Sequence, residues 1–173
     1  MITLISGTNR PGSNTLKVAT AYSAVLDILK VAHHLISLEN LPVDFARSYM
    51  PQSQPAEFKE LVKTKIRDVQ KFIVVIPEYN GTFPGIFKLF IDSLNPEDLR
   101  GKKIAVVGVS TGRGGNARGI DHITAAFLYL GMHVYPGHLP ISRLRELLGK
   151  EEELADPVIL RAMHMQAEGF SRF

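Results

Sequence analysis

The chain has 173 residues, 45% of them hydrophobic, and a formal net charge of +3 at neutral pH. This length predicts a single domain over residues 1–173, with enough apolar residues for a real core. The absence of cysteine excludes disulfides, thiolate metal sites and cysteine nucleophiles. The mild positive charge is spread along the chain; it suits an acidic small ligand and does not by itself indicate a nucleic-acid partner.

Signals for a membrane segment or a metal site are also missing from the sequence. No apolar run approaches the roughly 20 residues of a transmembrane helix, and the first residues form a strand-like run rather than a signal peptide. We therefore expect a cytoplasmic protein with no membrane partner. The six histidines show no metal-ligand spacing, so we expect no bound metal.

Strand-like and helix-like stretches alternate along the chain. Strands are predicted over residues 1–5, 33–37, 71–76, 103–109 and 132–135, and helices over residues 16–29, 56–69, 86–94, about 117–127 and from Pro157 onward. Residues 38–55 contain three prolines and are predicted as a surface excursion, and residues 140–173 as a helical C-terminal tail. This alternation predicts an α/β three-layer sandwich with a five-stranded parallel sheet in the flavodoxin-like order 2-1-3-4-5.

Three polar loops follow the first, third and fourth predicted strands. They cover residues 6–15, 77–85 and 110–116. Because the carboxyl ends of parallel strands meet at one edge of the sheet, the three loops should gather there, where α/β sheets bind their ligands. The sequence therefore predicts a single binding site built from these loops.

The first loop, SGTNRPGSNT at positions 6–15, combines hydroxyls, glycines and one arginine ahead of a helix. Free backbone N–H groups, side-chain donors and a helix N-terminus together favour an anion such as phosphate. Ser13 or Asn14 is the predicted N-cap of that helix. The loop lacks the Lys-Ser/Thr of a Walker A motif, and Asn9 stands at the second glycine of G-x-G-x-x-G. An ordinary capped turn remains an alternative.

The second loop, PEYNGTFPG at positions 77–85, is stiffened by two prolines, while its glycines allow backbone to approach a flat ligand. We expect Tyr79 to flank an aromatic ring and the amides of residues 79–81 to bond the polar edge of that ring. The alternative is a rigid structural turn in which Tyr79 packs on the following helix.

The third loop opens with GVSTG at positions 108–112, which matches the G-x-S-x-G nucleophile elbow of hydrolases. Asp156 and His164 follow Ser110 in the chain order of a catalytic triad. An elbow, however, turns straight into a helix, whereas residues 113–116 prolong this loop. A serine hydrolase is therefore the lesser alternative. Arg113 is a candidate to face a phosphate or a nicotinamide nucleotide.

Taken together, the three loops resemble those of the NADPH-dependent FMN reductases, a family of the flavodoxin-like superfold. The resemblance covers residues 1–138. GTNRPGSN at positions 7–14 is similar to the family loop that holds the FMN phosphate, and PEYNGTFPG resembles the P-E-Y-N-x-S/T-x-P-G turn against the isoalloxazine. STGRGG at positions 110–115 is similar to the glycine-rich third loop of the family.

This resemblance implies an FMN-dependent NAD(P)H oxidoreductase with NADPH or NADH as co-substrate. It implies a small-molecule electron acceptor (a quinone, an azo compound, a metal ion or free flavin) and a homodimer or homotetramer. No catalytic side chain is assigned, because hydride transfer takes place at the flavin. The implied cofactor-binding residues are Thr8, Arg10, Ser13, Asn14 and Thr15 at the phosphate, Pro77, Glu78, Tyr79, Asn80 and Gly81 at the ring edge, and Ser110, Gly112 and Gly115 on the other side. A flavodoxin-like electron carrier or regulatory module without NAD(P)H turnover is the alternative.

Overall fold

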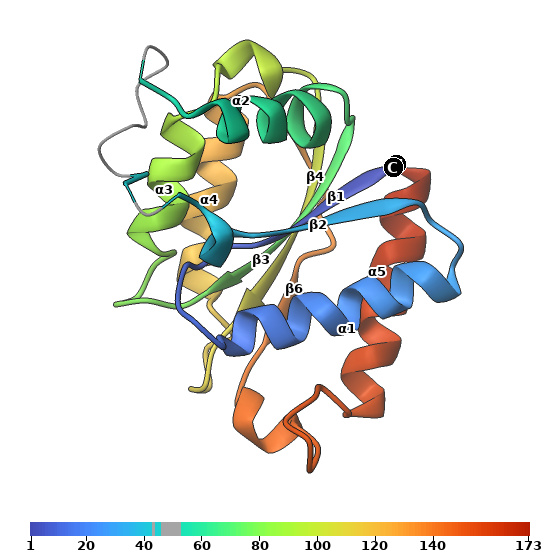
Figure 1. The fold of residues 1–173 in the computed structure, drawn as a ribbon. Coiled ribbons are helices and arrows are strands. Elements are labelled where there is room, and N and C mark those ends of the chain that lie inside the picture. The colour runs from blue at the N-terminus through green and yellow to red at the C-terminus, as the bar shows by residue number, and fades with distance from the viewer. Residues whose placement is uncertain (43, 46–52) are drawn as a thin grey trace.

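A parallel β-sheet forms the middle layer of the computed structural model, which describes residues 1–42, 44–45 and 53–173 (Figure 1). The strands are β1 (Ile2–Ser6), β2 (His33–Ser37), β3 (Lys71–Pro77), β4 (Lys103–Val109), β5 (His133–Val134) and β6 (Leu139–Ile141). The strand order β2-β1-β3-β4-β5 and the parallel pairing confirm the predicted flavodoxin-like sheet.

One edge of the sheet differs from the prediction, because two short strands share the place of the fifth strand. β5 pairs with the start of β4 and β6 pairs with its end, where Leu139 lies opposite Val107. The N–H of Tyr135 still donates to Ile104 O (2.8 Å), but Pro136 has no N–H with which to continue the ladder. The chain therefore leaves the sheet and rejoins it at Leu139, which adds a strand end beside the loop after β4.

Helices cover both faces of the sheet (Figure 1). One face carries α1 (Asn14–Ile28) and α5 (Pro157–Arg172); the other carries α2 (Ala56–Val62), α3 (Gly85–Asp92) and α4 (Ala117–Tyr129). Alternate residues of β3 enter the two cores: Val74 packs with α2, α3 and α4, whereas Val75 packs with α1 and α5. A strand that is buried on both faces requires the continuous apolar run seen in the sequence.

Helix boundaries follow local signals closely. Ser13 caps α1, since its Oγ accepts a hydrogen bond from Leu16 N (3.1 Å), and Asp156 caps α5. The second predicted helix ends earlier than expected, in a π-helical turn over Lys63–Arg67. The predicted excursion over residues 38–55 begins with the 3-10 turn Leu38–Asn40, and part of it lies outside the described residues. Among the helices described, none is long and apolar enough to cross a membrane.

Candidate functional site

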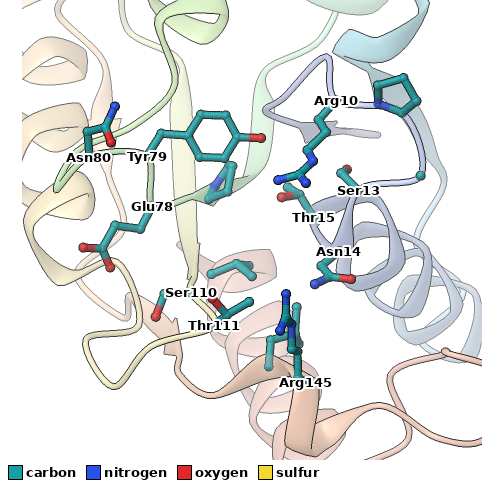
Figure 2. Close-up of a pocket in the computed structure, with 15 residues that line it drawn as sticks. Arg10, Ser13, Asn14, Thr15, Glu78, Tyr79, Asn80, Ser110, Thr111 and Arg145 are labelled. Atoms are coloured by element: carbon teal, nitrogen blue, oxygen red, sulfur yellow. The ribbon is translucent and has the colours of Figure 1, made fainter.

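Strand register places the three predicted loops at one edge of the sheet. Ser6 at the end of β1 lies opposite Val75, and Pro77 at the end of β3 lies opposite Val109 at the end of β4. The loops enclose a pocket of about 610 Å³ (Figure 2), within the range of roughly 300–1,000 Å³ found for small-molecule sites. The pocket is lined by Arg10, Pro11, Gly12, Ser13, Asn14, Thr15, Pro77, Glu78, Tyr79, Asn80, Val109, Ser110, Thr111, Leu144 and Arg145.

Most of the predicted binding residues line this pocket; Thr8, Gly81, Gly112 and Gly115 do not. Thr8 lies behind it, 1% exposed, with its Oγ1 3.0 Å from Tyr79 Oη. Gly115 shapes the third loop: its N–H donates to Ser110 Oγ (3.0 Å), and a Cβ at this position would lie only 2.8 Å from Pro140 Cβ. Thr8 and Gly115 support the pocket from outside it.

The N-terminus of α1 is the part of the pocket that is best suited to bind an anion. The N–H groups of Asn14 and Thr15, in the first turn of α1, have no partner in the described part of the chain. That turn contains no acidic residue, and Arg10 reaches into the same space from the loop (Figure 2). Free amides, a helix dipole and a guanidinium at one point favour a phosphate group.

The second loop is a tight turn whose geometry explains its sequence. Asn80 (φ 52°) and Gly81 (φ 78°) occupy the two central positions, and Tyr79 and Thr82 exchange backbone hydrogen bonds of 2.8 and 3.1 Å around them. Asn-Gly is the preferred pair where both central residues need positive φ. The N–H of Tyr79 donates to Thr82 O within the turn, so the prediction that it is free to bind a ring edge is wrong. The N–H groups of Asn80 and Gly81 have no partner in the described chain and remain available to a ligand.

The side chain of Tyr79 crosses the pocket rather than packing on α3. Its phenol reaches Thr8 in the first loop, and Figure 2 shows the ring directed toward the Arg10 side of the pocket. The other end of the turn is held by α4, where Thr82 Oγ1 lies 2.8 Å from His122 Nδ1. The second loop is therefore fixed on both sides, as a rigid platform for a ligand requires.

A smaller hollow of about 370 Å³ lies next to the main pocket and shares Glu78 with it. Gly112, Arg113 and Arg118 line it, so the predicted Gly112 belongs to this hollow rather than to the main pocket. Two guanidinium groups make the hollow basic and suited to an anionic group of a second ligand.

The geometry gives the serine hydrolase no support, because each residue of the candidate triad has a local partner. Ser110 Oγ donates to Gly112 O (3.0 Å) and accepts from Gly115 N (3.0 Å). Asp156 accepts the N–H groups of the first turn of α5, while His164 lies 3.9 Å from Glu168 further along that helix. These partners hold loop and helix structure together.

Six of the residues that line the pocket are absent from the predicted binding set: Pro11, Gly12, Val109, Thr111, Leu144 and Arg145. The first four lie in or directly beside the predicted loops, whereas Leu144 and Arg145 lie far from them in the chain. Arg145 belongs to the 3-10 turn Leu144–Leu147 that follows β6. Because the sequence does not predict β6, it does not mark the turn after β6 as a fourth loop at the binding edge. The short run Leu139-Pro140-Ile141 ahead of a polar turn is the signal that could have marked it. Across the described residues, no group of three or more His, Asp or Glu is arranged to hold a metal ion.

Comparison with known families agrees with this geometry. Residues 1–144 match the family model described as NADPH-dependent FMN reductase. The chain belongs to this family. It is accordingly an oxidoreductase enzyme that uses FMN and NADH or NADPH.

Two relatives and two solved structures illustrate the similarity. A protein of Pseudomonas aeruginosa named NAD(P)H-dependent FMN reductase is 31% identical over 133 residues, 75% of this chain and 70% of the relative. A quinone reductase of Escherichia coli is 29% identical with the same coverage, 75% and 70%. In fold, the chain is similar to the flavoenzyme FerB of Paracoccus denitrificans (TM-score 0.77, 20% identity, 99% and 94% of the chains covered). It is also similar to the flavodoxin of Megasphaera elsdenii (TM-score 0.62, 13% identity, 100% of both chains).

Proposed function

We propose that this chain is an FMN-dependent NAD(P)H:quinone oxidoreductase whose main pocket holds FMN. The observation that carries the proposal is the convergence of a phosphate-type cradle at the N-terminus of α1 with the rigid turn of the second loop in one pocket. A ligand with an anionic end and a flat ring with a polar edge fits both parts. FMN is such a ligand, and when bound it supplies the redox chemistry by accepting hydride and passing electrons on.

The residues divide into three groups in this proposal. Arg10, Ser13, Asn14 and Thr15 bind the phosphate through charge, hydroxyl and backbone N–H groups. Asn80 and Gly81 offer backbone amides to the ring edge, while Pro77, Glu78, Tyr79 and Ser110 form the walls that exclude water. Thr8, Gly112 and Gly115 act indirectly, by fixing the loops. The protein contributes placement and electrostatics rather than a general acid or base.

A quinone is the proposed acceptor because relatives with that activity in their names align with most of the chain. They include the Escherichia coli quinone reductase and a Burkholderia 2-hydroxy-1,4-benzoquinone reductase, which is 29% identical over 116 residues. The net charge of +3 also favours an enzyme over a flavodoxin-like carrier, since such carriers are usually strongly acidic. The proposal includes a cytoplasmic location and a homodimer or homotetramer; light scattering of the purified protein tests the oligomer.

A steady-state assay tests the enzyme function. The FMN-loaded protein is mixed with NADPH or NADH, with and without p-benzoquinone, and nucleotide oxidation is followed against an equal concentration of free FMN. We expect oxidation that depends on the protein and rises with the quinone. A flavin spectrum of the bound protein without oxidation above free FMN would instead identify an electron carrier. Azo dyes, ferric complexes and free flavin tested in place of the quinone rank the other acceptors.

A further inference from the structure

A segment that lies outside the family match reaches the binding pocket. The match ends at residue 144, and the next residue, Arg145, lines the pocket near Asn14 and on the side opposite Arg10 (Figure 2). The sequence predicts residues 140–173 as a helical C-terminal tail, with a helix from Pro157 onward. The role of residues 145–156, between the family match and α5, therefore has to be inferred from their own contacts.

Hydrogen bonds to the third loop fix the point from which Arg145 extends. Arg143 N donates to Gly112 O (2.7 Å), and Leu144 N donates to Ser110 O (3.1 Å). The side chain of Leu144 is fully buried in the core beneath α1 and α5. Arg145 is thus anchored to the same loop that forms a wall of the pocket.

Residues 149–153 of the segment form a turn that contacts α1 through an ion pair. Gly149 N donates to Glu153 O (2.8 Å), and Glu152 forms an ion pair with Lys17 of α1 (2.5 Å). A second hollow of about 470 Å³ lies here and shares Asn14 and Arg145 with the main pocket. The segment therefore lies against the N-terminal end of α1, where the phosphate cradle is found.

Charge distinguishes Arg145 from its neighbour in the same turn. Arg143 lies 3.8 Å from Glu146, whereas Arg145 has no ion pair or hydrogen bond within the described residues. Arg10 on the opposite wall likewise has no carboxylate partner there. Two unpaired guanidinium groups consequently enter one pocket from opposite sides of the free amides of α1 (Figure 2).

We propose that Arg145 is a second cationic binding residue for the phosphate of the cofactor, closing it against Arg10 and the N-terminus of α1. The inference rests on the proposed function, in which FMN is bound with its phosphate at that end of the pocket. A phosphate dianion has acceptor oxygens for more than one guanidinium, and each charge-assisted bond is stronger than a neutral one. The phosphate then links the first loop to the C-terminal segment.

Comparison of FMN with riboflavin isolates this contact, because riboflavin lacks only the phosphate. Apoprotein is titrated with each flavin by fluorescence, using the wild type, Arg145→Gln and the control Arg143→Gln, which removes the same charge from the same turn. We expect Arg145→Gln to weaken FMN binding about tenfold and riboflavin binding by less than about twofold. Arg143→Gln should change neither affinity by more than about twofold. Arg145 is exposed, so thermal unfolding of the apoprotein should match the wild type.

Each outcome of the titration decides between the two proposals. If Arg145→Gln binds FMN within about twofold of the wild type, or loses equal affinity for both flavins, the assignment of Arg145 is wrong while the FMN site stands. The assignment is also wrong if Arg143→Gln weakens FMN binding as strongly as Arg145→Gln, because the loss of affinity then reflects the net charge of the protein and not a specific contact. If the wild type binds neither flavin, the proposed function fails and the inference fails with it.

Discussion

The phenol of Tyr79 lies 3.0 Å from the hydroxyl of Thr8, and this contact joins the first loop to the second. Thr8 is 1% exposed, and its Oγ1 also accepts the N–H of Arg10 (3.3 Å). One buried hydroxyl thus aligns a residue of the phosphate cradle with a residue of the ring platform. The distance between the two parts of the proposed FMN site depends on this link.

Tyr79→Phe should therefore weaken FMN binding although the ring of the side chain is kept. The lost hydrogen bond corresponds to about 0.5–1.5 kcal/mol. Fluorescence titration of Tyr79→Phe, Thr8→Val and the double variant measures the coupling between the two residues. We expect a coupling energy of that size, and strictly additive losses would show that the link does not hold the site together.

Ser13 has two roles that different substitutions separate. Its Oγ caps α1 by accepting from Leu16 N (3.1 Å), and the residue also lines the pocket. Ser13→Ala should lower the free energy of unfolding by about 1 kcal/mol through loss of the cap. Ser13→Asp keeps a capping oxygen but places a negative charge beside the phosphate, so it should retain stability and weaken FMN by about tenfold or more.

Denaturant unfolding of the apoprotein and FMN titration test both Ser13 variants. If Ser13→Asp bound FMN as tightly as the wild type, the phosphate would lie elsewhere.

The two glycines predicted in the third loop should respond differently to alanine. At Gly115 the φ is +55° and a Cβ would lie 2.8 Å from Pro140 Cβ, so Gly115→Ala should destabilise the protein by about 1–3 kcal/mol. At Gly112, a Cβ would have no atom of the described residues within 4 Å beyond its chain neighbours, and Gly112→Ala should change stability by less than about 0.5 kcal/mol. Thermal or urea unfolding of the two variants measures the contrast, and equal losses would contradict the packing of Gly115 on Pro140.

The free energy of unfolding should decrease as the pH falls below neutral, because of His138. Desolvation by burial lowers the pKa of this residue below its usual 6.5, an effect that Asp121 partly opposes, and its Nδ1 has no partner among the described residues. Below about pH 6.5 the unfolded chain takes up a proton that the folded chain resists, so the folded state loses stability as the pH falls through this window. This contribution is fully present above the unfolded pKa.

His138→Gln should flatten the pH dependence of the unfolding free energy between about pH 7.5 and 5.5. Urea unfolding at several pH values measures the slope, and the exposed His133→Gln serves as the control. An unchanged slope in His138→Gln would mean that another group titrates.

Local sequence signals were enough to predict the sheet and most of the pocket. The apolar run of β3, the cap at Ser13 and the Asn80-Gly81 turn each follow from residues within a few positions of one another. Alternating strands and helices then admit few topologies, so the loops after β1, β3 and β4 were expected at one edge. The family resemblance added the cofactor, which pattern alone had left as an unspecified phosphate.

Only the tertiary structure decided the contacts between residues far apart in the chain. The partner of the Tyr79 phenol, the close approach of Gly115 to Pro140 and the position of Arg145 opposite Arg10 depend on how separate segments pack. β6 shows the reason most clearly: three residues carry too little periodicity to identify a strand, and its pairing with β4 is what brings Arg145 to the pocket. The sequence alone determined the edge of the sheet at which the pocket lies, whereas packing decided which side chains surround it.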